Sequence, residues 1–189
     1  MKSFGGLVTI PVLALSLVGG ASSPALAQRF SDPDVLAPSY PTPEPVVDQM
    51  LTIAQLKAGE TLYDLGCGDG RIVIAAAQKY KAKAVGIEIR REIYERTLAK
   101  VAALGLSDHV RIVQGNALKY DLSPADVVTL YLLTSSNERL KPILAKDLRP
   151  TARVVSHDFE IKGWKASAIQ KVQVEGRQHT IYLYKISDK

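Results

Sequence analysis

The chain has 189 residues, of which 47% are hydrophobic and 23% are charged. This size and composition exclude a disordered or fibrous protein and predict one globular domain with its own core. The net charge of +5 comes without a dense Lys/Arg block among aromatic residues, so we expect no nucleic-acid partner. The sole cysteine, Cys67, excludes an internal disulfide and a cysteine-based zinc site, and we expect no metal centre.

The N-terminus has the order of features found in secretory signal peptides. Lys2 is followed by an apolar stretch at residues 7–18 and then by Ala25-Leu26-Ala27, which fits the A-x-A cleavage pattern. The apolar stretch is short for a membrane span. We therefore expect residues 1–27 to be the cleaved leader of an exported protein or, as an alternative, an uncleaved anchor that attaches the protein to a membrane.

Residues 28–41 are rich in Pro, Ser and Asp and predict a linker or lid in front of a domain at 42–189. Thr42-Pro43-Glu44 predicts the start of a helix, with Thr42 as the N-cap residue. Ser135-x-x-Glu138 predicts a second capped start, for a helix that is bent or restarted near Pro142. The other predicted elements are strands at 61–65, 83–88, 110–114, 125–133 and 153–156, helices at 71–80 and 92–104, and a hairpin of 168–174 with 180–186.

The alternation of strands and helices predicts a Rossmann-like, doubly wound α/β fold with a mainly parallel sheet. The nearly continuous apolar run at 125–133 is typical of a strand buried on both faces of such a sheet. The two C-terminal strands around Glu175-Gly176 would add an antiparallel hairpin to it.

The run from Asp64 to Arg71, D-L-G-C-G-D-G-R, joins the first predicted strand to the first predicted helix of the sheet. Its glycines allow positive φ angles and a close approach of ligand to backbone, and a helix N-terminus offers free N–H groups. Arg71 stands where a dinucleotide-binding fingerprint has its third glycine. Asp64 would repel a pyrophosphate and suits a ligand that carries an ammonium group. A plain glycine turn without a ligand is the alternative.

Glu88 ends the second predicted strand, about 20 residues beyond the turn, where an acidic residue meets ribose hydroxyls in nucleotide-binding α/β units. With Asp64 and the glycines, it resembles the first motif, D-x-G-x-G-x-G, and the following acidic position of seven-strand S-adenosylmethionine (SAM)-dependent methyltransferases. A surface glutamate at a strand end is the alternative interpretation.

Further segments extend this resemblance over residues 40–186. They are Pro41-Thr42-Pro43 with Val46-Val47, and the stretches 63–74, 127–133 and 153–159. In these the chain is similar to the mitochondrial protein-lysine methyltransferases of the ATP synthase c subunit and the adenine nucleotide translocase, and to their bacterial relatives. The resemblance implies a methyltransferase that uses SAM and modifies a lysine amine of a protein, with membrane proteins among the candidates.

The resemblance also implies roles for individual positions. The glycine turn would surround the methionine part of SAM, Asp64 would bind its ammonium group and Glu88 its ribose. Asn116, where many methyltransferases have aspartate, would lie beside adenine with Ala117. The full set of implied cofactor-binding residues is Asp64, Gly66, Cys67, Gly68, Gly70, Glu88, Asn116 and Ala117.

A lysine acceptor must lose a proton before it can attack, which costs about 4.6 kcal/mol at pH 7 from a reference pKa of about 10.4. Apolar surroundings lower this pKa, and aromatic faces can hold the cation beforehand. The candidates for catalytic or acceptor contacts are Tyr40, Tyr131 and Asp158, with His157 and Phe159 beside them, because these residues flank the carboxyl ends of predicted strands or the lid. Tyr131 as a core residue and His157 as a strand-end residue are the alternatives.

Other functions remain open at this point. No N-P-P-Y tetrapeptide follows the strand at 125–133, which argues against amide and adenine N-methyltransferases that use that motif. A small-molecule N- or O-methyltransferase and a non-catalytic SAM-binding envelope protein are the alternatives. An NAD oxidoreductase is disfavoured by Arg71 and by the lack of a Tyr-x-x-x-Lys motif. The exported leader conflicts with the cytosolic location of SAM.

Overall fold

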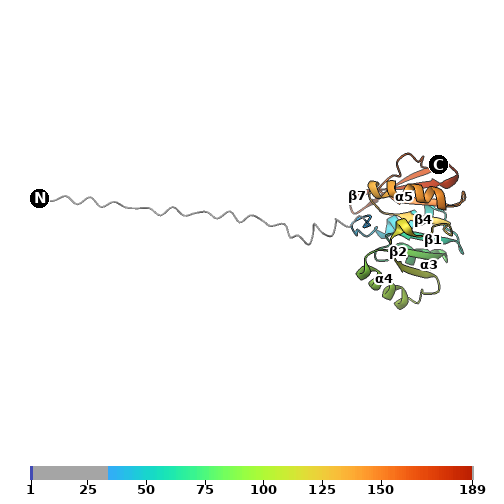
Figure 1. Ribbon diagram of the computed structural model, residues 1–189, viewed down its shortest axis with the longest axis horizontal. Helices are drawn as coiled ribbons and strands as arrows, with labels where there is room; N and C mark the ends of the chain where they lie inside the picture. The colour runs from blue at the N-terminus through green and yellow to red at the C-terminus, as the bar shows by residue number, and fades with distance from the viewer. Residues whose placement is uncertain (2–33, 189) are drawn as a thin grey trace. The chain divides into compact units, whose positions relative to one another are not determined.

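The computed structural model describes residues 34–188 and Met1. The predicted leader at 1–27 and residues 28–33 of the predicted linker lie outside the described residues. Residues 34–188 belong to one compact unit (Figure 1). Its elements are α2 (Glu44–Ile53), β1 (Thr61–Leu65), α3 (Arg71–Tyr80), β2 (Lys83–Glu88), α4 (Arg91–Ala103), β3 (Val110–Gln114), η1 (Ala117–Lys119), β4 (Val127–Leu130), α5 (Thr134–Asp147), β5 (Arg153–His157), β6 (Ala168–Val174), β7 (Arg177–Lys185) and η2 (Ile186–Asp188).

The sheet has seven strands in the order β3-β2-β1-β4-β5-β7-β6. Strands β1 to β5 pair in parallel, and β7 pairs antiparallel with both β5 and β6. The predicted α/β fold with its C-terminal hairpin is confirmed. The order reverses between β1 and β4, and ligands of open α/β sheets bind at the carboxyl ends of the strands beside such a point. Asp64 lies there, in register with Gly86 of β2 and Thr129 of β4.

Apolar side chains cover both faces of the sheet. On one face, residues of α2 and α3 such as Met50 and Val73 pack with Leu62 of β1. On the other, Leu140 and Leu144 of α5 pack with alternate residues of the same strands. Successive side chains of a strand point to opposite faces, so a strand buried on both sides is apolar throughout. The sheet is therefore a rigid support for the loops at its carboxyl edge.

The structure corrects two predicted helix starts. The N-cap residue of α2 is Pro43, without a side-chain cap, and the Thr42 hydroxyl instead lies 3.2 Å from Nδ1 of His157. Helix α5 begins at Thr134, so Ser135 lies inside the helix and the predicted capping box is absent. At the start of α2, local capping is thus replaced by a tertiary contact.

Some predicted element bounds also change. Helix α5 continues through Pro142 to Asp147, strand β4 covers only Val127–Leu130, and β7 begins at Arg177. The turn between β6 and β7 has positive φ at both Glu175 and Gly176, the geometry that two-residue hairpin loops prefer. No helix within residues 34–188 is long and apolar enough to cross a membrane.

Candidate active site

The glycine turn after β1 has the conformation that its sequence predicts. Gly66, Gly68 and Gly70 have φ angles of +82°, +54° and +76°. The N–H groups of Gly66 and Cys67 both donate to the carbonyl of Ile87, at 2.9 and 3.0 Å. A Cβ atom on Gly70 would lie 2.7 Å from Cγ2 of Thr97, a distance at which the neighbour must move. Glycine is thus required at position 70 by both conformation and space.

Cys67 fills the inner side of this turn. Its side chain is 5% exposed, and a Cβ atom on Gly86 would lie 2.7 Å from its Sγ. Burial raises the pKa of the thiol, and the charges of Asp64 and Glu88 raise it further. A small residue in this place and a glycine in β2 therefore fit each other, and the thiol is packed as a core group.

Two buried carboxyl groups lie beside the turn. Asp64 is 3% exposed and accepts a hydrogen bond of 2.8 Å from the Thr129 hydroxyl. Burial raises its pKa to about 7; the Thr129 hydrogen bond opposes this shift and the charge of Glu88 adds to it. Glu88 is 2% exposed and accepts from the Gly68 N–H at 3.1 Å and the Arg90 N–H at 2.9 Å. Buried acidic groups near a cavity are typical of functional sites.

A cavity of about 240 Å³ lies over the turn and the ends of β1 and β2. It is bordered by six of the eight predicted cofactor-binding residues, namely Asp64, Gly66, Cys67, Gly68, Glu88 and Ala117. Gly70 and Asn116 are not on its wall, although residues next to each of them are. Gly70 affects the conformation of the turn instead, through its positive φ and its close packing against Thr97.

Asn116 holds the loop after β3 in place and has unused hydrogen-bonding capacity. Its Oδ1 accepts from the Leu118 N–H at 2.9 Å, which starts η1. Its Nδ2 is buried and has no hydrogen-bond partner among residues 34–188. A buried donor without a partner is costly.

Residues 34–42, here called the lid, form the remaining long wall of this cavity. The hydroxyl of Ser136 donates to the carbonyl of Leu36, whose side chain is buried. Arg71 donates to the carbonyl of Thr42 at 2.7 Å and pairs with Asp69 of the turn at the same distance. Arg71, which in the sequence only argues against a dinucleotide, thus ties the lid to the glycine turn.

A second cavity of about 240 Å³ adjoins the first. Its aromatic wall consists of Tyr40, Tyr131 and Phe159, and Arg177 contributes the one charged side chain that lines it among the described residues. Tyr40 and Tyr131 border both cavities, as do three lid or strand-end residues. Burial and the charge of Asp158 raise the pKa of Tyr131. Sequence reasoning missed Arg177, because it carries no local motif.

Asp158 lies outside the walls of both cavities. Its carboxylate accepts hydrogen bonds from the guanidinium of Arg177 at 2.8 Å and from the Thr180 N–H at 2.9 Å. Next to it, the buried ring of His157 packs against Tyr131 in a tilted arrangement, with ring centroids 3.8 Å apart. Tyr40 and Tyr131 therefore line a cavity that an acceptor could enter. Asp158 does not line this cavity and contacts Arg177, which does.

This strand order, with a glycine turn after β1 and acidic residues ending β1 and β2, defines a seven-strand SAM-dependent methyltransferase. The protein-family model of the ANTKMT methyltransferase domain matches residues 64–168 of the sequence, and the chain belongs to that family. Its cofactor is SAM. Because the chain belongs to a methyltransferase family, the alternative of an NAD oxidoreductase is excluded.

Individual relatives differ in the acceptors that their names give. A protein-lysine N-methyltransferase of Saccharolobus islandicus is 49% identical over 152 residues, covering 80% of this chain and 94% of the relative. A lysine N-methyltransferase of the ATP synthase c subunit, from Xenopus laevis, is 27% identical, covering 86% and 71%. The solved structure of an RNA methyltransferase from Salinibacter ruber with S-adenosyl-L-homocysteine has a TM-score of 0.72 and 45% identity, covering 78% of this chain and 94% of that one.

Proposed function

We propose that this methyltransferase transfers the methyl group of SAM to the amine of a protein lysine. The observation that carries the proposal is the second cavity, which has aromatic walls and shares Tyr40 and Tyr131 with the first. A lysine side chain is long and thin and ends in a cation, so it suits a small aromatic cavity next to the methyl donor.

Within the first cavity the residues are suited to SAM as follows. Asp64 binds the ammonium group of the methionine part, because its buried carboxylate lacks a cationic partner among the described residues. Gly66, Cys67 and Gly68 border the same part of the cofactor, and Glu88 accepts the ribose hydroxyls. Ala117 borders the part of the cavity assigned to adenine, and the neighbouring Asn116, which is off the wall, has a buried Nδ2 without a partner among the described residues.

In the second cavity, protein groups hold the amine and favour its neutral form. Tyr40, Tyr131 and Phe159 supply ring faces for the incoming ammonium group. Apolar walls and the nearby guanidinium of Arg177 then disfavour the charged form, which lowers the pKa of the lysine. Once the proton has left to solvent, the nitrogen lone pair attacks the methyl carbon in line with the departing sulfur, and positioning supplies most of the rate.

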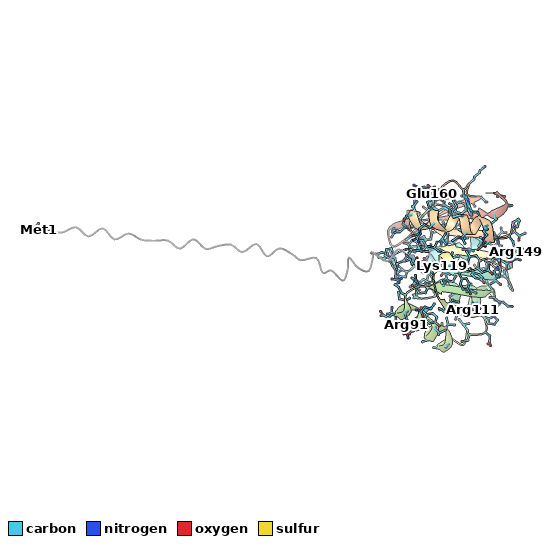
Figure 2. All side chains as sticks on the ribbon, in the orientation of Figure 1. Met1, Arg91, Arg111, Lys119, Arg149 and Glu160 are labelled. Carbon is cyan, nitrogen blue, oxygen red and sulfur yellow. The ribbon has the colours of Figure 1, made fainter. Side chains whose placement is uncertain are left out.

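An RNA acceptor is the second candidate, and the Salinibacter ruber neighbour is the observation that favours it. An aromatic cavity beside an arginine can also stack a base. However, the sequence contains no dense Lys/Arg block among aromatic residues, and the basic side chains labelled in Figure 2, Arg91, Arg111, Lys119 and Arg149, come from separate segments of the chain. RNA binding usually needs a continuous basic surface, so the lysine acceptor is preferred.

The acceptor is tested by incubating the protein with labelled SAM and, in parallel, a membrane-protein extract, a soluble-protein extract and total RNA. Mass spectrometry of the products should locate the label on lysine side chains. Replacing Tyr131 with Leu should reduce lysine labelling, whereas Tyr94→Phe, which lines neither cavity, should not. Label on RNA bases, on small molecules or on hydroxyl groups alone would overturn the lysine assignment and leave the methyltransferase class intact.

Residues 1–27 are proposed as a leader that exports the protein or anchors it to a membrane, and a membrane protein is the proposed substrate. The support is the order of charge, apolar stretch and A-x-A in the sequence. An anchored enzyme facing the cytosol would have both SAM and membrane substrates within reach. Cell fractionation with N-terminal sequencing decides this: an unprocessed, soluble cytosolic protein would contradict it.

A further inference from the structure

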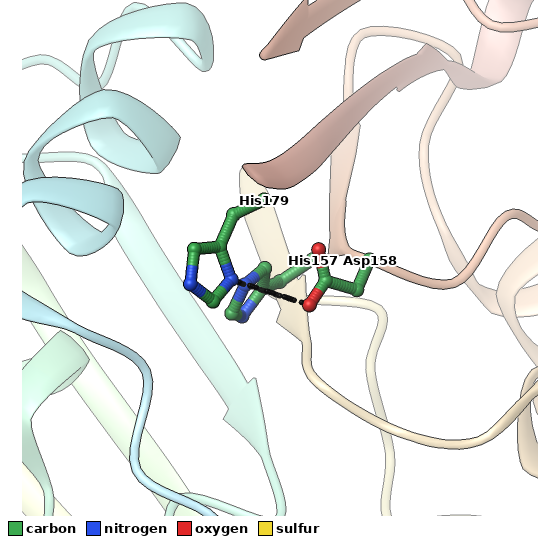
Figure 3. A group of neighbouring side chains, drawn as sticks. All are labelled: His157, Asp158 and His179. Carbon is green, nitrogen blue, oxygen red and sulfur yellow. Dashed lines mark hydrogen bonds and ion pairs between the residues drawn. The ribbon is translucent and has the colours of Figure 1, made fainter. Parts of the chain in front are cut away.

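Three side chains from the end of β5 and from β7 bring possible metal-binding atoms within 4.8 Å of one another around a common point (Figure 3). His157 Nε2 lies 2.8 Å from His179 Nδ1, and Asp158 Oδ2 lies 3.4 and 3.3 Å from these two nitrogens. Ligands about 2.0–2.2 Å from a tetrahedral zinc ion are roughly 3.3 Å apart, close to two of these three distances. We propose that His157, Asp158 and His179 bind one divalent transition-metal ion of the zinc class.

The surroundings hold these side chains in a binding arrangement. The Thr42 hydroxyl lies 3.2 Å from Nδ1 of His157, which leaves Nε2 to face the common point. Oδ1 of Asp158 accepts the Thr180 N–H at 2.9 Å, which leaves Oδ2. Such partners behind the ligands fix their orientation in metal sites. Asp158 also has a φ of +59°, a costly conformation for a residue other than glycine, which is typically retained at functional positions.

The donor set selects the class of ion. Two imidazole nitrogens and one carboxylate oxygen suit zinc and neighbouring transition metals, whereas magnesium and calcium require mostly oxygen ligands. Both imidazoles are buried, and Asp158 is partly exposed. Three protein ligands leave a fourth position for water or another ligand.

Arg177 competes with the ion for one oxygen. Its guanidinium lies 2.8 Å from Oδ2 of Asp158, but its side chain is 64% exposed and can turn outward. Metal binding would therefore displace Arg177 from Asp158. Because Arg177 also lines the second cavity, the ion would change the charge distribution there without touching an acceptor.

The test uses the full chain, treated with a chelator and then titrated with zinc chloride by calorimetry. The expected result is one saturable site per chain. His179→Asn should weaken zinc binding by at least about 10–100-fold, since even changes to the partners of a ligand have effects of that size. His109→Asn is the matched control, because the chain has three histidines and His109 is exposed and outside the cluster.

Two further variants keep the test decisive. Asp158→Asn takes the place of His179→Asn if that variant does not give a cooperative melting curve. Thr42→Val should weaken zinc binding by about tenfold while leaving all three ligands in place. Cobalt titration should give visible absorption bands in the wild type that the ligand variants lose. Absence of saturable zinc binding, or equal affinity in wild type and ligand variants, would overturn the proposal.

Discussion

At the scale of single residues, Asp64 is a buried acidic group whose charge would depend on the bound ligand. In the protein without SAM its buried carboxyl has a pKa of about 7, so protonated and ionised forms are both populated at neutral pH. The ammonium group of SAM would stabilise only the ionised form. Cofactor affinity and stability should therefore both respond to pH through this one side chain.

SAM affinity should fall as the pH is lowered below about 7, because protons then compete with the ammonium group for Asp64. Between about pH 7 and pH 5.5 the dissociation constant should rise by on the order of tenfold. Asp64→Asn should bind more weakly at pH 7 and show no such pH dependence. Calorimetry at a series of pH values measures both, and a flat wild-type profile would contradict the assignment.

The same raised pKa acts on stability in the absence of SAM. Well below pH 3.8, the ordinary pKa of an aspartate, Asp64 is neutral in both the folded and the unfolded chain, so it carries no penalty. As the pH rises toward 7, only the unfolded chain ionises freely, and the folded state loses stability. Asp64→Asn should thus gain stability over the wild type with rising pH, by up to about 4 kcal/mol. Urea unfolding at about pH 4 and pH 7.5 measures the difference, and a constant difference would disprove the linkage.

Glu88 should contribute directly to cofactor binding. Glu88→Ala removes an acceptor of charge-assisted hydrogen bonds and should weaken SAM binding by about 1.5–3 kcal/mol. Glu95→Ala, which alters an exposed carboxylate of α4, is the control. Calorimetry on folded variants gives the affinities, and an unchanged value for Glu88→Ala would exclude the ribose assignment.

At the scale of elements, β1, β2, β3 and α3 begin and end at the residues that the sequence predicts. Their apolar patterns are strong because both faces of the sheet are covered. The misplaced start of α2 has a tertiary cause. The Thr42 hydroxyl lies beside His157, a contact between segments far apart in sequence that a local capping rule does not contain. For α5 the helix simply begins one residue earlier than the predicted cap, at Thr134.

In the candidate site, too, residues of one local unit could be predicted from the sequence, and residues brought together by strand pairing could not. Asp64, the glycines and Glu88 were predictable because they belong to one strand-turn-helix unit and the next strand. Arg177 and His179 were not, since only the pairing of β5 with β7 brings them to Asp158, about 20 residues away. The expectation of no metal centre followed from the single cysteine, which does not bear on histidine and aspartate ligands, and the zinc titration tests it.

The glycine turn gives a prediction at this scale. Gly70→Ala should destabilise the protein by about 2–4 kcal/mol, because it combines a strained φ with a collision against Thr97. Gly105→Ala is the matched control, since Gly105 also has a positive φ, of +66°, but faces open space. The difference between the two variants in urea unfolding isolates the collision. Equal losses would show that the turn relaxes freely.

At the scale of the whole molecule, we expect the leader to be dispensable for folding and the lid to be needed for SAM binding. A chain beginning at Gln28 should melt within about 2 °C of the full chain, because we expect the leader to lie outside the fold. A chain beginning at Pro43 should remain folded but lose SAM affinity, since residues 34–42 wall the first cavity. Thermal melting and calorimetry on the two truncations check this. Loss of cooperative unfolding at the Gln28 start would refute the leader assignment.

The burial of Cys67 against Gly86 also determines the redox behaviour of the molecule. Thiol–disulfide exchange requires an accessible thiolate, and the raised pKa and 5% exposure of Cys67 make that species scarce in the folded chain. A thiol-specific reagent should react at the rate of unfolding, and fast labelling of the native protein would contradict this. The folded enzyme would then resist forming disulfide-linked dimers in an oxidising envelope as well as in a reducing cytosol, whichever side of the membrane it occupies.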